Sequence, residues 1–449
     1  MTVLRRNSKL HKRLGPNFIL FLEHAAGAIN RIFPHVEVST WREGGPRPTE
    51  CYLTSENYKL EICILIGEKD DDGGVSLTAT VTRKSNLTLD RRELDICKLT
   101  AQRISTVLAN SNIMEIDQAS MSAMSRSFDE DVVAEHIKKH HKLELDIALV
   151  FRALHTLSEQ SYENKSLTFG CLIDSKDKTP PSGFEFPSEF LISKKYKALS
   201  DGFRTAYLIS AKGKVLNFVN LDRYRKGKKT IEQNFPDWAE QMANASRVGR
   251  CGISLNRQGE ILVFEEGTLR FSYRFGSWQY WNHSQVIEIL RRSARVQKVP
   301  PAVVGQVVGS IYRAALDISF RRTGAMFVII RRRQDLHELV RHGDALADAG
   351  RSHADSAFDG ILRNRKIQFT PRGIAAELAS LDGSIVIENI GTIVAYGAIL
   401  QPKKIGRLKG TEGSRTKAAI GASNYGLALK VSADGDICVY QSGKLLLRV

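Results

Sequence analysis

The spacing of hydrophobic positions changes several times along the chain, and each change predicts a different kind of element. Apolar residues recur with helical spacing over 18–33 and again over 89–109. Between these predicted helices, residues 58–66 and 75–83 are rich in the β-branched and apolar residues that favour strands. The first part of the chain is therefore predicted to be a mixed α/β module rather than a helical bundle.

Strand patterns dominate the next part of the chain. The apolar runs Ala206–Ser210 and Val215–Val219 are joined by a short segment containing a glycine, which predicts a β-hairpin. Similar runs follow and end in an aromatic cluster, Trp278, Tyr280 and Trp281. Aromatic side chains can stack on a nucleic-acid base, but in a strand-rich module they more often belong to the core. We interpret this cluster as packing.

Helical spacing returns at Ser284, is interrupted at Pro300–Pro301 and continues to about Ile318, where strands and helices begin to alternate. The predicted fold class is α/β, with a C-terminal mixed-sheet domain preceded by mixed α/β and strand-rich modules. The expected segments are a mixed α/β module at 1–150, a strand-rich sensor-like module at 151–290, a helical linker at 291–320 and the C-terminal domain at 321–449.

Three histidines lie among lysines at His136, His140 and His141. His136 and His140 are one helical turn apart, a spacing that can bind zinc. No carboxylate or cysteine stands at ligand spacing in the sequence, and the lysines would repel a cation. We interpret the stretch as the solvated basic face of a helix that begins at His136.

Composition excludes several classes of protein. With 449 residues, 42% of them hydrophobic and 25% charged, the chain is neither disordered nor collagen-like. Its apolar runs are too short to span a bilayer, and the start of the chain fits an amphipathic helix better than a signal peptide. The six cysteines are scattered and form no CxxC pair. Reduced thiols, a cytoplasmic location and no membrane contact are expected.

The net charge of +16 is uneven, because residues 320–449 carry 20 Lys+Arg against 12 Asp+Glu. Basic runs stand at Arg331–Arg333 and Lys403–Lys409. Such an excess fits a nucleic-acid-binding surface, a pocket for a polyphosphate ligand, or a solvated surface. Composition does not separate these three.

Two motifs in this basic region can carry chemistry. In the first, Asp382 and Gly383 stand at the start of a predicted strand, where an aspartate can hold a divalent cation or accept a proton from a sugar hydroxyl. The second, residues 413–421, combines a glycine, hydroxyls and two cationic side chains ahead of small residues that begin a helix. This combination favours phosphate binding. It is not a Walker loop, since the chain has no GxxxxGK[ST] sequence.

These motifs, preceded by Gly324–Ile330 and followed by Val431–Ile437, resemble the diadenylate cyclase domain family, which includes the catalytic domain of DNA-integrity-scanning cyclases. The resemblance covers about residues 305–449. Asp382–Ser384 matches the family's DGA motif and Gly413–Ala419 its GTRHRAA motif. Family members condense two ATP into cyclic di-AMP with release of pyrophosphate, need a divalent metal and bring two domains face to face.

The resemblance implies roles for particular residues of this chain. Asp382 would be the catalytic residue and the metal ligand. The nucleotide would be bound by Gly383, Ser384, Gly413, Ser414, Arg415, Thr416, Lys417 and Ser423. The implied cofactor is Mg²⁺ or Mn²⁺, the implied substrate is ATP, and the implied assembly is a homodimer or higher homo-oligomer through face-to-face cyclase domains.

Several positions depart from the family pattern, including the segment Ser432–Asp436, where the family has Ser-Glu-Glu-Thr-Gly. Thr416 replaces a histidine, Lys417 an arginine, Ser384 an alanine and Asn424 a glutamate. Lysine keeps the charge of arginine but loses its two-pronged hydrogen-bonding geometry. The leading hypothesis is a diadenylate cyclase regulated by its N-terminal modules. The alternatives are a catalytically degenerate nucleotide-binding sensor and a basic nucleic-acid-binding protein, the latter not favoured because no helix-turn-helix or zinc-finger signature is present.

Overall fold

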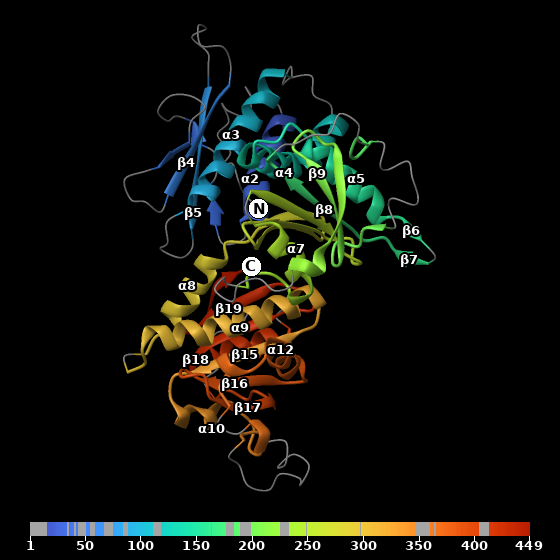
Figure 1. Cartoon of the computed structure of the whole chain (residues 1–449). Helices are drawn as coiled ribbons and strands as arrows, with labels where there is room; N and C mark the ends of the chain where they lie inside the picture. Colours follow the sequence, from blue (N-terminus) through green and yellow to red (C-terminus); the bar gives the residue numbers. More distant parts are fainter. Residues whose placement is uncertain are drawn as a thin grey trace. The chain divides into compact units, whose positions relative to one another are not determined.

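The computed structural model of the chain divides into two compact units, residues 1–232 with 238–281 and residues 233–237 with 282–449 (Figure 1). The structure describes residues 16–33, 36–39, 42–43, 51–53, 59–66, 75–83, 89–110, 118–162, 164–176, 184–188, 199–224, 233–247, 249–296, 298–346, 360–362, 365–403 and 413–449. The predicted loop Lys403–Lys409 lies outside them after its first residue. The described elements confirm the predicted α/β class.

The first unit begins with a group of helices and an antiparallel sheet. The helices are α2 (Pro16–Ile32), α3 (Arg91–Asn110), α4 (Gln118–His141) and α5 (Ile147–Ser158). The strands are β1 (Val36–Val38), β2 (Arg42–Glu43), β3 (Cys51–Leu53), β4 (Lys59–Ile66) and β5 (Val75–Arg83), in the order β1-β5-β4-β3 with β2 also on β5. Contacts of α2 with β1 and of α3 with β4 cover this sheet. The two long helices and two long strands predicted here are confirmed.

A seven-stranded mixed sheet follows in the same unit, in the order β10-β9-β8-β11-β12-β13-β14 within the described residues. Its strands are β8 (Phe169–Asp174), β9 (Thr205–Ser210), β10 (Val215–Asn220), β11 (Arg250–Leu255), β12 (Ile261–Glu265), β13 (Thr268–Arg274) and β14 (Ser277–Tyr280). Smaller elements are β6 (Ser161–Tyr162), β7 (Lys165–Ser166), η2 (Leu221–Tyr224), η3 (Asp237–Ala239) and α7 (Glu240–Ala245). Among the described strands of this sheet, β8 and β9 are the one parallel pair. Trp278, Tyr280 and Trp281 are buried, which confirms their interpretation as packing.

The histidine-rich stretch closes a helix, although the sequence predicted that it opens one. Helix α4 ends at His141, where Lys142 turns into a left-handed conformation with φ of 54°. Asp146 then caps α5, its side chain accepting a hydrogen bond from the Leu149 amide. The predicted solvated face is also wrong for His136 and His141, which are buried because this side of α4 packs on the seven-stranded sheet.

The second unit is built on a six-stranded mixed sheet, in the order β17-β16-β15-β18-β19-β20 within the described residues. Its strands are β15 (Ala325–Ile330), β16 (Ser384–Glu388), β17 (Ile393–Ala398), β18 (Gly426–Val431), β19 (Ile437–Gln441) and β20 (Lys444–Arg448). Its helices are α8 (His283–Ser293), α9 (Pro301–Arg321), α10 (Leu336–Leu339), α12 (Arg372–Ser380) and α13 (Ser414–Ala422), with short turns η4 (Arg333–Asp335) and η5 (Ile367–Phe369). The strand predicted at Asp382–Gly383 is confirmed as β16, which pairs in parallel with β15.

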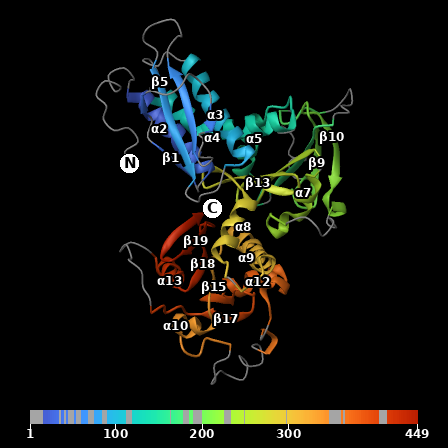
Figure 2. The same cartoon turned by 90° about the vertical axis from the view of Figure 1, so that its left-hand side faces the viewer.

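Helices cover both faces of this sheet (Figure 2). On one face α13 packs against side chains such as Met326, Val328 and Ala428, through Ala419 and Ile420. On the other face α9 and α12 contact β15 and each other. The two helices expected as a linker, α8 and α9, belong to this second unit. The unit is thus a three-layer sandwich with an almost wholly apolar sheet in the middle.

An ion pair buried on the α9–α12 side joins the two helices. The Arg372 guanidinium donates from Nε and Nη2 to the two carboxylate oxygens of Asp317, each at 2.6 Å. It also donates to the Phe235 carbonyl at 2.6 Å, while the Asp237 amide donates to Asp317 at 2.8 Å. Burial raises the pKa of Asp317, and the charge of Arg372 opposes that rise. The pair therefore ties α9, α12 and the segment 233–237 into one unit.

Among the described residues no helix is both long and apolar enough to cross a bilayer. Cys97, Cys171, Cys251 and Cys438 are buried and form no disulfide. Burial raises the pKa of the Cys171 thiol to about 12, so this side chain behaves as a small apolar group.

We expect Arg372→Ala to destabilise the second unit by about 3–5 kcal/mol, because Asp317 is left buried without its partner. The matched control is Arg321→Ala, which removes the exposed ion pair with Glu377 and should cost less than about 1 kcal/mol. Urea unfolding followed by circular dichroism measures both. Equal losses in the two variants would contradict a central role for the Asp317–Arg372 pair.

Candidate functional site

The two predicted motifs meet at the end of the six-stranded sheet where β15 and β16 begin. Phe327 pairs in parallel with Ile385, so the register places Ala325 beside Gly383 two residues earlier. On its other side Ala325 pairs with Val431, the last residue of β18. Because neighbouring strands are about 5 Å apart, the starts of β15 and β16 and the end of β18 form one continuous surface. We call it the Asp382 end of the sheet.

Asp382 is held at this end by close contact between two backbones. Gly383 has φ of 123°, and a Cβ on it would lie 2.4 Å from the carbonyl carbon of Gly397 in β17. Positive φ and this close approach both require glycine. The adjacent Ser384 is buried and donates its hydroxyl to the Ala398 carbonyl at 3.0 Å. Asp382 itself is exposed, so its carboxylate is available to a ligand.

The second motif supplies the start of α13. Its N-cap is Gly413, which has no side chain to cap the first amides, and no acidic residue stands in the first turn. Ser414 and Arg415 are exposed, and Thr416 and Lys417 are half-buried. Uncapped amides at a helix N-terminus attract anions, and the two cationic side chains add to that attraction.

Arg415 connects the start of α13 to the start of β15. Its guanidinium lies directly on Gly324, the residue before β15, since a Cβ there would fall 1.8 Å from Nη1 of Arg415. Extending the β15–β16 register by one more residue places Gly324 beside Asp382. The cation of the phosphate motif and the carboxylate of the aspartate motif are therefore brought to the same end of the sheet.

Lys430 is a further cation at this site, and the motifs did not identify it. Its Nζ donates to the Thr416 hydroxyl at 2.9 Å. Lys430 pairs with Met326, whose side chain lies on the α13 face of the sheet. Lys430 could have been found from the sequence, because it is the one charged residue in the otherwise apolar strand β18.

Ser423 takes a structural role in the described geometry. It is fully buried, donates its hydroxyl to the Ile420 carbonyl at 2.7 Å and accepts the Gly443 amide at 2.8 Å. It thereby joins the end of α13 to the turn between β19 and β20.

The basic run Arg331–Arg333 follows the opposite end of β15, where Arg332 pairs with Asp335 at 2.8 Å. These arginines therefore do not contribute to the Asp382 end.

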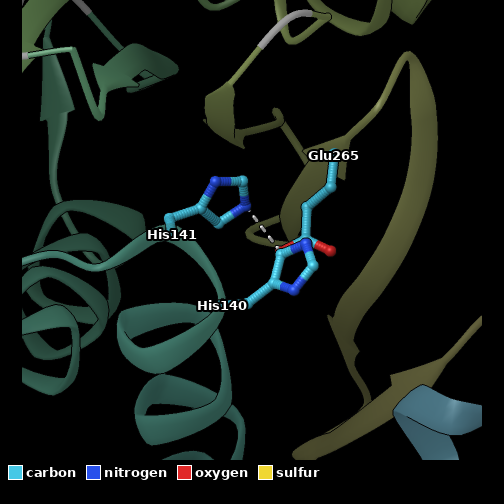
Figure 3. A group of neighbouring side chains, drawn as sticks. All are labelled: His140, His141 and Glu265. Carbon is cyan, nitrogen blue, oxygen red and sulfur yellow. Dashed lines mark hydrogen bonds and ion pairs between the residues drawn. The ribbon is translucent and has the colours of Figure 1, made fainter.

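A separate cluster in the first unit joins α3, α4 and β12. One ligand atom from each of His140, His141 and Glu265 lies within 4.8 Å of the others (Figure 3). His141 Nε2 is 2.9 Å from a Glu265 carboxylate oxygen, and Arg92 pairs with the same carboxylate. Glu265 was missed by sequence reasoning because it lies far along the chain from the histidines.

The charge state of this cluster follows from its burial. Burial alone would raise the pKa of Glu265, but the hydrogen bond from His141 and the charge of Arg92 lower it to about 2. Burial lowers the pKa of His140, and it lowers that of His136 to about 4. Near neutral pH the cluster therefore contains a charged carboxylate beside neutral imidazoles at His136 and His140.

The chain is similar to known proteins over only about a third of its length. No family model matches the chain, and no curated protein matches it. Among solved structures, a double mutant of DacA from Staphylococcus aureus, a diadenylate cyclase, is 22% identical over 33% of this chain and 85% of its own, with a TM-score of 0.23. A hypothetical membrane-spanning protein from Bacillus cereus is 21% identical over 32% of this chain and 69% of its own, with a TM-score of 0.23.

Proposed function

We propose that the second unit is a nucleotidyltransferase that condenses two ATP into cyclic di-AMP. One observation carries the proposal: Arg415 of the phosphate motif lies on Gly324, next to the strand that begins at the aspartate motif. An anion-binding helix start and an exposed carboxylate thus share one end of a rigid sheet. Nucleotidyl transfer needs this combination, because the triphosphate must be held while the reacting phosphorus is positioned.

The start of α13 is the proposed triphosphate site. The uncapped amides after Gly413 face an anion with their N–H groups, and Arg415 and Lys417 add charge-assisted hydrogen bonds. Lys430 adds a third positive charge through its contact with Thr416. In this proposal Ser414 contributes a hydroxyl, whereas Ser423 and Ser384 hold the surrounding backbone in place.

The donor set at the Asp382 end fits a hard divalent cation. Mg²⁺ is commonly bound by one or two carboxylates together with substrate phosphate oxygens, and Asp382 offers one exposed carboxylate beside the proposed triphosphate site. When bound, Mg²⁺ or Mn²⁺ would neutralise charge on the α-phosphate. Asp382 would hold the ion and orient the attacking 3′-hydroxyl, and Gly383 fixes the position of Asp382.

The reaction requires two opposed nucleotides. The 3′-hydroxyl oxygen of one ATP bonds to the α-phosphorus of the other, the bond to pyrophosphate breaks, and the hydroxyl proton is released. Repetition in the other direction closes the ring and releases a second pyrophosphate. Since the described residues of each chain offer one such site, we propose that two copies face each other in a homodimer or higher homo-oligomer.

We expect the full chain, incubated with ATP and Mg²⁺ or Mn²⁺, to form cyclic di-AMP, and Asp382→Asn to reduce the rate at least about 100-fold. ATP binding should persist in this variant, because the triphosphate site is untouched. Mass spectrometry of the products, with each of the four NTPs in turn, measures the activity and the base preference.

The control for this experiment is Glu377→Gln, which neutralises an exposed carboxylate on α12 paired with Arg321. It should keep wild-type activity. A wild-type chain that forms no cyclic dinucleotide with either metal would sink the cyclase proposal, and so would equal activity in Asp382→Asn and wild type.

We expect Gly324→Ala to weaken ATP binding roughly tenfold or more, the effect of losing one hydrogen bond to a charged group. The new methyl group would displace the guanidinium of Arg415, a flexible end, so the fold should be retained. Gly373→Ala, where a Cβ meets nothing within 4 Å, is the matched control. Calorimetric titration should give Gly324→Ala and Arg415→Ala the same loss, and unchanged affinity in both would exclude this role for Arg415.

A nucleotide-binding sensor without catalysis is the second candidate. It is favoured by the hydrogen bond from Lys430 to Thr416, which occupies the hydroxyl at the position where the resembling family has histidine. In that case the wild-type chain should bind ATP and release no product. The double variant Thr416→His, Asn424→Glu should then gain activity, and a double variant that stays inactive would count against this candidate.

A further inference from the structure

The cluster of His140, His141 and Glu265 presents three donor groups to one point. His140 and His141 end helix α4, and Glu265 ends strand β12, so the groups come from two rigid elements. Figure 3 shows both imidazole rings beside the carboxylate. Glu265 and His141 are buried, whereas His140 is exposed. An ion at this point would thus have a buried side held by protein and one side open to solvent.

The donor chemistry fits a borderline transition metal. Two imidazole nitrogens and one carboxylate are the three protein ligands of many zinc sites in which a fourth position is left to water. His140 Nε2 lies 3.1 Å from Arg92 Nη2, and since a guanidinium only donates, this nitrogen presents its lone pair. The carboxylate of Glu265 and a lone pair on His140 are therefore already in place for a metal ion.

The positive charge that now pairs with the buried carboxylate of the cluster is that of Arg92. It contacts Glu265 and the Nε2 atom of His140, so its guanidinium satisfies the same groups that a metal ion would bind. It also pairs with the exposed carboxylate of Glu266 at 3.0 Å. Arg92 can therefore leave Glu265 without losing every partner, because Glu266 lies beside it toward solvent.

We propose that His140, His141 and Glu265 form a site for a divalent transition metal of the zinc class, in which the metal exchanges with Arg92 for the buried carboxylate. His141 now donates from Nε2 to Glu265, because a carboxylate only accepts, and a metal bound at this nitrogen would require the imidazole proton to stand on Nδ1 instead. The ion joins the end of α4 to the β12–β13 turn. Zinc binding then stabilises the first unit through mass action.

The test uses the full chain, stripped with EDTA and returned to metal-free buffer. Zinc alone is the probe, measured by equilibrium dialysis with elemental analysis, and cobalt substitution reports the geometry through its visible absorption. The wild-type chain should bind one zinc ion tightly. His140→Ala changes an exposed residue and should keep the fold. It should weaken zinc binding at least about 100-fold, because losing a group that only hydrogen-bonds to a metal ligand already reduces metal affinity by up to about that factor.

Two further variants separate the metal site from a plain ion pair. Arg92→Gln removes the competing cation and should tighten zinc binding at least about fivefold. His342→Ala, an exposed histidine of the second unit, is the matched control and should bind zinc like the wild type.

The proposal is overturned if the wild-type chain binds no more zinc than His140→Ala does. This holds even if Arg92→Gln binds zinc, because that result would mean that Arg92 excludes the metal from the wild-type site. It is also overturned if Arg92→Gln binds zinc more weakly than wild type. Thermal unfolding with and without zinc gives a second measurement that needs no ligand substitution. A zinc-dependent rise in the melting temperature of wild type that is absent in His140→Ala supports the site.

Discussion

The buried pair of Asp317 and Arg372 is the interaction on which the second unit depends. A charge pair in an apolar layer is tolerated only when further hydrogen bonds complete it, and here backbone groups of Phe235 and Asp237 supply them. Arg372 is the first residue of α12, and Asp382 follows shortly after the helix ends. Fixing the start of α12 therefore also limits where Asp382 can lie.

The Asp382 end of the sheet brings two cationic side chains close to an exposed carboxylate. Arg415 lies on a glycine and Lys430 donates to a hydroxyl, and neither cation has an ion pair with a carboxylate among the residues that the structure describes. The two cations therefore give this end of the sheet a positive electrostatic potential beside the exposed Asp382. A polyphosphate with a bound divalent ion carries the complementary pattern of charge.

Local pattern predicted the long strands β4, β5, β9 and β10 and the helices α2, α3, α8 and α9, because an apolar run and its turn residues are contained within a few positions. It also placed Asp382 and the α13 motif correctly on a strand start and a helix start. It failed where partners come from distant segments. Glu265 beside His141, and Lys430 beside Thr416, depend on how whole elements pack, and no local period carries that information. The end of α4 was missed because Lys142 gives no sign of a left-handed turn.

The contact between Gly383 and Gly397 has a consequence for how this protein can change. Two backbones that touch leave no side chain to vary, so the position of Asp382 can be adjusted only by moving whole strands. The opposite wall of the site is made of side chains on the first turn of α13, which can be exchanged one at a time. Variation of ligand preference is thus expected to run through the helix and to spare the sheet.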